Sequence, residues 1–126
     1  MKRKFTKSWK SSKQPRKQRK YQRNAPLNIK HRFLSVLLSD QLREKYQKRN
    51  IPVKKGDTVK ILRGQFKKKS GKVTKVFLKK TRVHVEGMDL VKKDGSKVPY
   101  SIHPSNLMIT ELTLDDKKRQ KVFTKK

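Results

Sequence analysis

The segment GDTVKILRGQFKKKSGKVTKV, residues 56–76, contains two alternating apolar stretches separated by a basic turn. Alternation of this kind predicts two β-strands joined by a loop. Gly64 and Gly71 flank a loop with three consecutive lysines, and glycine allows backbone angles and close approaches that other residues exclude. We therefore expect this loop to lie against an acidic partner such as a phosphate backbone. The alternating apolar residues are Val59, Ile61, Val73 and Val76.

The composition indicates the same kind of partner. The chain has 126 residues, with 38 Lys and Arg against 9 Asp and Glu, and a net charge of +29. Such a charge predicts binding to a polyanion, with nucleic acid as the first candidate and an anionic membrane as the second. With 31% hydrophobic and 37% charged residues, the chain is expected to form one small domain with appendages that a partner orders.

Several classes of protein are disfavoured by what the sequence lacks. There is no cysteine, so neither a disulfide framework nor a thiolate metal site is possible. The apolar runs are far shorter than a bilayer span requires. We therefore expect a cytoplasmic protein with no membrane span, no cofactor and no homo-oligomer.

Residues 1–31 are predicted to form a basic, extended RNA-binding arm. The segment has no acidic residue, and repulsion between its like charges predicts disorder in isolation. Phe5, Trp9 and Tyr21 lie between the cations, where they could stack on unpaired bases or pack on the protein's own surface. Both interpretations stay open from the sequence. The candidate RNA-binding cations of the arm are Lys13, Arg16, Lys17, Arg19, Lys20 and Arg23.

Residues 32–50 are predicted to be a short helical segment. Apolar residues in RFLSVLLSDQLREKYQKRN recur at spacings of three and four, which is typical of an amphipathic helix that covers a core. Ser39 is a candidate N-cap, with Asp40 at the positive end of the helix that follows. The prediction is two short helices with a break near Ser39, or one bent helix, ending before Pro52.

Residues 51–114 are predicted to form a small closed β-barrel, which makes the protein mainly β. Five short strands in some sixty residues favour a barrel over a sandwich, and turn residues separate the strands. Residues 115–126 form a basic C-terminal tail, for which we expect only the start of a solvated helix. The strands are marked by Val59 and Ile61, Val73 and Val76, Val83 and Val85, Val98, Tyr100 and Ile102, and Leu107 and Ile109.

Residues 53–61, 63–67 and 71–76 resemble the KOW motif of certain ribosomal and transcription-elongation proteins. Four further stretches make the resemblance more specific. With them, residues 12–114 resemble the archaeal and eukaryotic branch of a family of KOW-bearing large-subunit ribosomal proteins, number twenty-four in bacteria and twenty-six in eukaryotes. Lys68 and Ser70 depart from the family pattern, which often has a glycine and an acidic residue there. The four stretches are SKQPRKQRK (12–20), NAPL (24–27), LSDQLREKY (38–46) and IHPSNL (102–107).

The resemblance implies a noncatalytic protein with an SH3-like barrel and an arm that threads between RNA helices. It implies binding to large-subunit ribosomal RNA, a role early in assembly and a position near the mouth of the nascent-peptide tunnel. The expected partners are this RNA, neighbouring large-subunit ribosomal proteins and nascent-chain factors at the tunnel exit.

The candidate RNA-binding residues of the barrel lie in its loops and turns. We expect them to recognise RNA shape, sugars and phosphates more than base edges. Phe66 has two interpretations, stacking on a base or plugging the edge of the barrel, and the second is slightly favoured. The candidates are Arg63, Gly64, Phe66, Lys67, Lys68, Lys69, Gly71, Lys72, Lys79, Lys80, Arg82, His103, Ser105 and Asn106.

Three alternative functions make different demands on the sequence. An RNA-cleaving enzyme would need paired histidines, but His31, His84 and His103 lie in separate predicted elements. A KOW-type transcription factor would carry a second acidic or mixed-charge domain for RNA polymerase. A DNA-compacting protein would need no particular loop sequence. The predicted protein is therefore not an enzyme, and the other two alternatives are separable by binding experiments.

Overall fold

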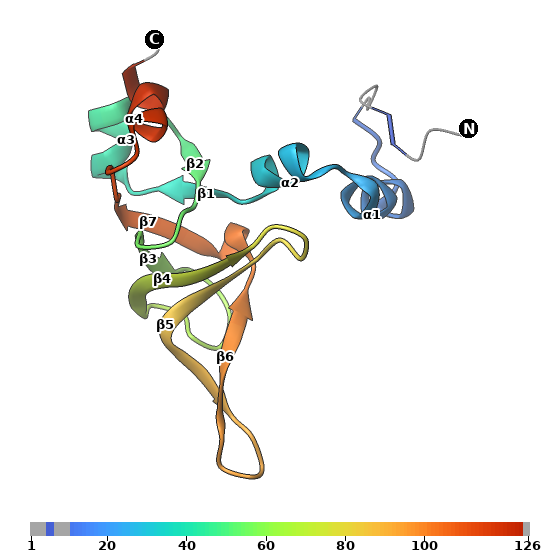
Figure 1. Ribbon diagram of the computed structural model, residues 1–126, viewed down its shortest axis with the longest axis vertical. Coiled ribbons are helices and arrows are strands. Elements are labelled where there is room, and N and C mark those ends of the chain that lie inside the picture. The colour runs from blue at the N-terminus through green and yellow to red at the C-terminus, as the bar shows by residue number, and fades with distance from the viewer. Residues whose placement is uncertain (1–4, 7–10, 125–126) are drawn as a thin grey trace.

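A seven-stranded mixed sheet forms the body of the protein in the computed structural model, which describes residues 5, 6 and 11–124 (Figure 1). The strand order is β2-β1-β7-β3-β4-β5-β6, with β1 parallel to β7 and all other neighbours antiparallel. The sheet is open and the predicted mainly β class is confirmed, whereas closure into a barrel remains a prediction. The strands are β1 (Ser35–Leu38), β2 (Asn50–Pro52), β3 (Thr58–Ile61), β4 (Ser70–Phe77), β5 (Arg82–Val91), β6 (Lys97–Ile102) and β7 (Leu107–Glu111).

The five strands predicted from alternation are confirmed as β3 to β7. Most of the apolar residues that mark them are buried, although Val98 is exposed and Val76 and Tyr100 are half-buried. Together with the first two strands they enclose one apolar core. Because each fully buried aliphatic side chain contributes about 1.5–3 kcal/mol, this core is the main source of the fold's stability. The core residues are Leu34, Val36, Leu38, Ile51, Val53, Val59, Ile61, Phe66, Val73, Val83, Val85, Met88, Ile102, Leu107 and Ile109.

The helical prediction for residues 32–50 holds at Arg32 and Phe33, which end helix α2, but is wrong for residues 35–38 and for residue 50, which lie in strands. Val36 and Leu38 are fully buried and alternate with half-buried neighbours, so this stretch follows a period of two and forms β1. Strand β1 pairs with β7 on one side and β2 on the other, and Pro52 lies in β2 at the sheet edge, where its missing N–H is tolerated. Long-range pairing with β7 outweighs the local helical spacing.

The middle of the same segment agrees with the prediction. Helix α3 (Asp40–Tyr46) begins directly after Ser39, which lies at the N-cap, and Asp40 occupies the first turn. The Ser39 carbonyl accepts from the Arg43 N–H at 2.9 Å, while the Ser39 N–H donates to Ile109 of β7 at 2.9 Å. The break near Ser39 is therefore confirmed, and it separates a strand from a helix.

Most of the described part of the arm is helical. The predicted extended conformation is therefore wrong for residues 15–24 and 27–31. Helix α1 (Pro15–Asn24) begins with a proline, whose missing N–H costs nothing at the first helical position. Its Lys, Arg and Gln residues are good helix formers despite their charge. Pro26 then precedes helix α2 (Leu27–Phe33), and both helices project to one side of the sheet (Figure 1).

A buried ion pair joins the C-terminal segment to the start of β3. Asp57 is 0% exposed and Arg119, in helix α4 (Lys117–Thr124), is 4% exposed. Both Arg119 terminal nitrogens donate to the Asp57 carboxylate at 2.6 Å, and one also donates to the Thr113 carbonyl at 2.9 Å. The same carboxylate accepts from the backbone N–H groups of Lys54 at 2.9 Å and Thr113 at 3.1 Å. This bidentate pair, with its added backbone donors, compensates both buried charges.

The C-terminal helix has further contacts with the body, which corrects the interpretation of residues 115–124 as a solvated tail. Lys54 forms an ion pair with Asp116, and the Asp116 carboxylate also caps α4 by accepting from the Lys118 N–H at 2.8 Å. These contacts hold the pKa of Asp116 below its usual value. Phe123 packs on Tyr46 of α3 with 4.3 Å between ring centroids. Residues 125 and 126 lie outside the described residues.

Gly71 has a structural role that differs from the predicted one. A Cβ at this position would lie 2.7 Å from the Glu86 carbonyl oxygen and 2.9 Å from Val85 Cγ1 on β5. Such distances are far below ordinary van der Waals contact, so β4 and β5 pack closely only because residue 71 is glycine. The close approach at Gly71 is therefore made by the protein's own strand.

Strands β5 and β6 continue past the core as a protruding hairpin (Figure 1). Its turn contains residues 93–96, with Gly95 at φ +86° and Asp94 accepting from both the N–H and the hydroxyl of Ser96. These bonds lower the pKa of Asp94. Leu90 and Val91 near the tip are exposed, which leaves the outer hairpin without a core of its own.

We predict that Arg119→Met destabilises the protein by about 3–5 kcal/mol, because it leaves the Asp57 carboxylate buried without its counter-charge. The measurement is the free energy of unfolding in urea. Lys118→Met removes one positive charge from the exposed face of the same helix and should change the free energy by less than about 0.5 kcal/mol. Equal stability of the two variants would contradict the role of the pair.

Candidate nucleic-acid interface

A basic cavity of about 490 Å³ lies between the arm and one end of the sheet. Three separate segments line it: helices α1 and α2, the turn from β4 to β5, and the end of β6. None of its described lining residues is acidic. The lining residues are Arg19, Gln22, Arg23, Phe33, Lys79, Lys80, Thr81, Arg82 and His103.

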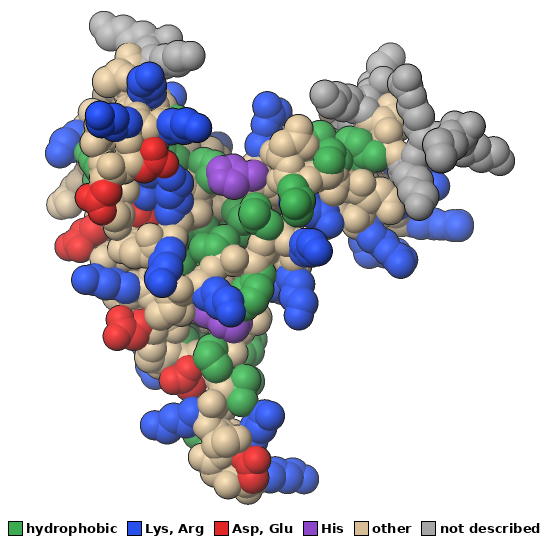
Figure 2. Space-filling view, in the orientation of Figure 1, with side chains coloured by type: hydrophobic (Ala, Val, Ile, Leu, Met, Phe, Trp, Pro, Cys, Tyr) green, Lys and Arg blue, Asp and Glu red, His purple; other side chains and the backbone are tan. Residues whose placement is uncertain are grey.

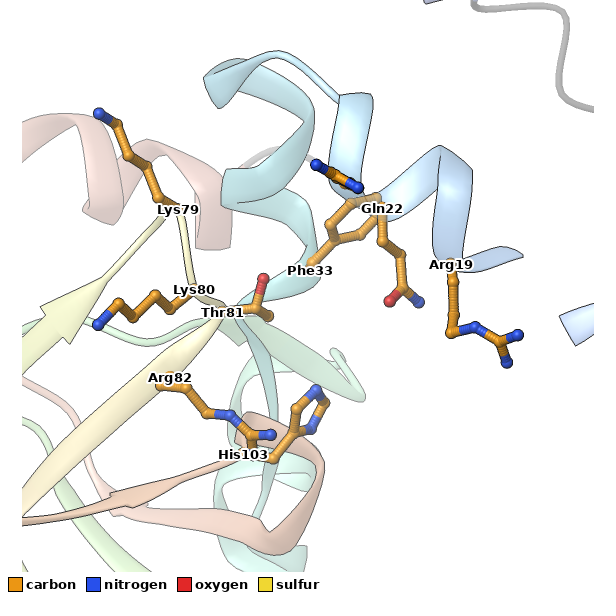
Figure 3. Close-up of a pocket in the computed structure, with 9 residues that line it drawn as sticks. Arg19, Gln22, Phe33, Lys79, Lys80, Thr81, Arg82 and His103 are labelled. Carbon is orange, nitrogen blue, oxygen red and sulfur yellow. The ribbon is translucent and has the colours of Figure 1, made fainter. Parts of the chain in front are cut away.

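Figure 3 shows how these side chains surround the cavity. Arg19 and Gln22 descend from α1, while Phe33 lies above and Arg82 and His103 lie below. The Lys79 and Lys80 side chains extend from the β4–β5 turn on the side away from α1. Five cations around one hollow repel one another in the free protein, and a polyanion would relieve that repulsion.

The β4–β5 turn that presents Lys79 and Lys80 has a strained backbone. Thr81 has φ +53°, a left-handed value that is rare for a β-branched residue, and its N–H donates to the Leu78 carbonyl at 3.4 Å. The turn sets Lys79 and Lys80 at its exposed centre and Arg82 at the first position of β5. Strain of this kind often accompanies functional loops.

His103 is held in one tautomer at the end of β6. Its Nδ1 accepts from the Ser105 N–H at 3.2 Å and lies 2.8 Å from the Ser105 hydroxyl, so the neutral ring carries its proton on Nε2. Burial, and secondly the positive charge of Arg82, lower the pKa of His103. The Ser105 backbone thus fixes the orientation of the ring, and at neutral pH the ring is an uncharged donor through Nε2.

A smaller groove of about 60 Å³ shares Arg82 and His103 with the basic cavity. It leads to the start of the KOW-like loop through Arg63, Gly64 and Asn106. The two hollows therefore form a continuous surface that joins the arm to the loop. The residues proposed from sequence that line one or both hollows are Arg19, Arg23, Arg63, Gly64, Phe66, Lys79, Lys80, Arg82, His103 and Asn106.

The basic loop that follows β3 exposes three lysines above a buried aromatic ring. Its ends are closed by hydrogen bonds from the Lys68 N–H to the Ile61 carbonyl, at 2.8 Å, and from the Ile61 N–H to the Lys69 carbonyl, at 2.9 Å. Lys68 has φ +72°, the left-handed backbone that favours glycine. Lys68 therefore has the backbone conformation that glycine most easily adopts.

Phe66 is 8% exposed and belongs to the apolar core, where it packs on Tyr100 with 5.3 Å between ring centroids. This burial favours the interpretation that Phe66 plugs the edge of the domain over the interpretation that it stacks on a base. The ring anchors the loop from beneath, while the ammonium of Lys69 lies 5.4 Å from its centroid. For Phe66 to stack on an RNA base, its ring would have to leave the apolar core.

The arm aromatics that the structure describes pack on one another. Tyr21 lies 5.0 Å from Phe5 and 6.1 Å from Phe33, measured between ring centroids. The interpretation that these rings cover the protein's own surface is therefore confirmed for Phe5 and Tyr21. Trp9, the third candidate for stacking, lies outside the described residues.

Of the remaining predicted residues, nine are exposed and line neither hollow, and the half-buried Gly71 packs against β5. Sequence reasoning missed Gln22, Phe33 and Thr81, which do line the cavity. The spacing of Phe33 predicts a helix residue that covers the core, and no local pattern distinguishes a cavity wall from a core face. The exposed residues outside the hollows are Lys13, Arg16, Lys17, Lys20, Lys67, Lys68, Lys69, Lys72 and Ser105.

Catalytic and metal-binding arrangements are absent from the part of the chain that the structure describes. His84 bonds with the Ser101 hydroxyl at 3.0 Å, while burial, followed by nearby Lys75 and Lys80, lowers its pKa. His31 and His103 line different hollows. Residues 5, 6 and 11–124 hold no group of three His, Cys, Asp or Glu residues that could bind a metal, and no helix among them is long and apolar enough to cross a membrane.

The few acidic side chains lie away from the arm. Figure 2 shows Lys and Arg along the arm and over much of the visible face, with Asp and Glu gathered over the body and at the hairpin. The ion pairs of the described residues are Asp40–Arg43, Asp116–Lys54 and Asp57–Arg119, and none uses a proposed RNA-binding residue. The cations of the cavity are thus unneutralised by carboxylates of the described chain.

Comparison with known proteins identifies a family for this basic, mainly β chain. Residues 12–126 match the model of the family described as the eukaryotic L26 and archaeal L24 ribosomal proteins. The chain belongs to this ribosomal protein family. It is 51% identical over 114 residues to the large ribosomal subunit protein uL24 of Methanothrix thermoacetophila, covering 90% of this chain and 98% of that protein. The uL24 of Methanosphaera stadtmanae is 51% identical over 115 residues, covering 91% and 98%.

Membership of this eukaryotic and archaeal family confirms the resemblance seen in the sequence. It identifies a structural, non-enzymatic protein of the translation apparatus, located in the ribosome and therefore in the cytoplasm. The segment matched by the family model includes α1, the sheet and α4, so the basic cavity is built entirely from residues within it.

We predict that Lys68→Gly stabilises this family member by about 1 kcal/mol, because an L-residue pays about that much for a left-handed backbone. Lys67→Gly removes the same charge from a neighbouring position whose φ is not positive, and should destabilise the protein by about 0.4–1 kcal/mol. Urea unfolding of both variants checks the difference. Destabilisation of equal size in both would show that the turn does not need a left-handed residue.

Proposed function

We propose that this chain is a structural component of the large ribosomal subunit and binds large-subunit ribosomal RNA through its basic surface. The observation that carries the proposal is the joined pair of hollows, where cations from the arm and from the sheet meet without a carboxylate among the described lining residues. Family membership supports the same conclusion, since both relatives are named large ribosomal subunit proteins.

The proposed RNA-binding residues act mainly by electrostatics. Lysine and arginine side chains replace counterions condensed on the phosphates, and the released ions favour binding. The exposed cations of α1 follow one stretch of the RNA backbone, and Lys67, Lys68, Lys69 and Lys72 follow another. His103 supplies an uncharged donor to a phosphate or a 2′-hydroxyl between them. Recognition then depends on RNA shape and sugar–phosphate contacts.

The finer parts of the proposal follow from the family resemblance. We propose that residues 51–114 form an SH3-like KOW barrel, of which β3, β4, β5, β6 and β7 are the strands. Residues 1–31 act as the RNA-binding arm and residues 32–50 connect it to the barrel. The protein binds early in assembly and lies near the tunnel exit, next to other large-subunit proteins and within reach of nascent-chain factors.

Salt dependence tests the proposed role of the KOW-like loop. Changing Lys67, Lys68 and Lys69 to Gln should reduce the slope of log affinity for large-subunit ribosomal RNA against log salt by about 2, at about 0.7–0.9 for each lost phosphate contact. The control changes three exposed lysines of α4, Lys117, Lys118 and Lys121, to Gln. If the slope of log affinity against log salt falls by the same amount in both triple variants, only net charge matters and the loop has no specific role.

Sedimentation tests the proposed assembly. In a cell extract on a sucrose gradient, the protein is expected to travel with the large ribosomal subunit at moderate salt and to be released at high salt, because its contacts are mostly ionic. Protein that stays at the top of the gradient at moderate salt, or travels with RNA polymerase, would contradict the proposal. Preference for duplex DNA over ribosomal RNA in competition would contradict it as well.

A further inference from the structure

The basic cavity has a shape that phosphate binding alone does not require. A backbone-tracking surface needs only a row of cations, such as the exposed side of α1 provides. The cavity is instead a hollow of about 490 Å³, inside the range of pockets that enclose a small ligand, roughly 300–1,000 Å³. It combines cations with an aromatic ring, an amide and a hydroxyl, from Phe33, Gln22 and Thr81.

The aromatic wall is fixed in place by the protein. Phe33 is half-buried at the end of α2, and Tyr21 meets its ring edge-on, with 6.1 Å between centroids and 60° between planes. Tyr21 lines a separate hollow on the other side of Phe33 and not the basic cavity. An aromatic ring held at the wall of a basic hollow is the arrangement by which proteins stack an unpaired base.

The polar groups of the cavity complement the other parts of a nucleotide. Gln22 lies beside Phe33 in Figure 3 and offers both a donor and an acceptor, which suits the hydrogen-bonding edge of a base. The Arg82 side chain reaches toward His103 below the hollow, where its guanidinium can bind phosphate oxygens, and Arg19 lines the hollow from α1. His103 adds a neutral Nε2–H donor, because its Nδ1 is engaged by Ser105.

We propose that this cavity accepts a single unpaired nucleotide that projects from the ribosomal RNA, with its base against Phe33 and its phosphate at Arg82 and His103. The inference rests on the proposed RNA-binding function and specifies the ligand of that site. Paired bases in an RNA helix are not available to such a hollow, whereas a bulged nucleotide leaves the helix and can enter it. Helix α1 supplies part of the cavity lining, so the site exists only while α1 lies beside the sheet. A bound nucleotide therefore also holds the arm in this position.

The experiment uses the full-length protein and three RNA hairpins of one sequence. The first has a single bulged adenosine, the second has an abasic residue at the bulge, and the third is fully paired. The protein is expected to bind the adenosine bulge about tenfold more tightly than the other two, which corresponds to about 1.4 kcal/mol. Equal binding of the adenosine and abasic bulges would overturn the proposal, because the base would then make no contribution.

Two variants test the residues assigned to the base. Phe33→Leu keeps an apolar side chain but removes the ring, and Gln22→Ala lies on an exposed face of α1, where the change does not disturb the core. Each is expected to reduce the preference for the adenosine bulge at least threefold and to leave affinity for the paired hairpin unchanged. Lys72→Gln, outside the cavity, should lower affinity for all three RNAs alike. Retention of the full preference in both variants would also overturn the proposal.

The outcomes separate this inference from the proposed function. If the wild-type protein binds all three hairpins with equal affinity and steep salt dependence, RNA binding stands and the nucleotide site is wrong. If it binds none of them, and large-subunit ribosomal RNA is not bound either, the proposed function itself is wrong.

Discussion

The buried pair between Asp57 and Arg119 is the constraint on which the rest of the structure depends. The Asp57 carboxylate accepts from two backbone N–H groups and from both terminal nitrogens of Arg119, so four contacts converge on one fully buried group. Those contacts join the turn before β3 to the segment after β7 and to helix α4, across about sixty residues of sequence. A carboxylate without these partners would be costly to bury, so the pair couples the stability of the sheet to that of the C-terminal helix.

The same pair explains how a chain of net charge +29 keeps a folded body. In the described residues, carboxylates of Asp57, Asp116 and Asp40 form ion pairs with Arg119, Lys54 and Arg43, and none of these cations is a proposed RNA-binding residue. Internal neutralisation thus stabilises the fold, while the cations of the proposed RNA surface are left to interact with phosphate. Charge repulsion is concentrated where a polyanionic ligand would remove it.

Much of the candidate surface could be predicted from sequence, but its geometry could not. Lys79, Lys80 and Arg82 were identifiable as a basic turn, and Arg19 and Arg23 as part of a basic arm. Nothing in either pattern indicates that the two groups share one cavity, because their proximity depends on where α2 leads the chain. Phe33 shows the limit most clearly. Its spacing fits a core-facing helix residue, and only the packed structure makes it a cavity wall.

The sequence by itself predicted a polyanionic partner and determined the strands of the sheet from β3 to β7. Net charge and period-two alternation are local or additive properties, so they can be read without knowing which segments meet. Only the tertiary structure decided that residues 35–38 form a strand, that Arg119 is buried and that Gly71 serves the contact between β4 and β5. Each of these features depends on pairing between segments far apart in the chain, where long-range contacts outweigh local preference.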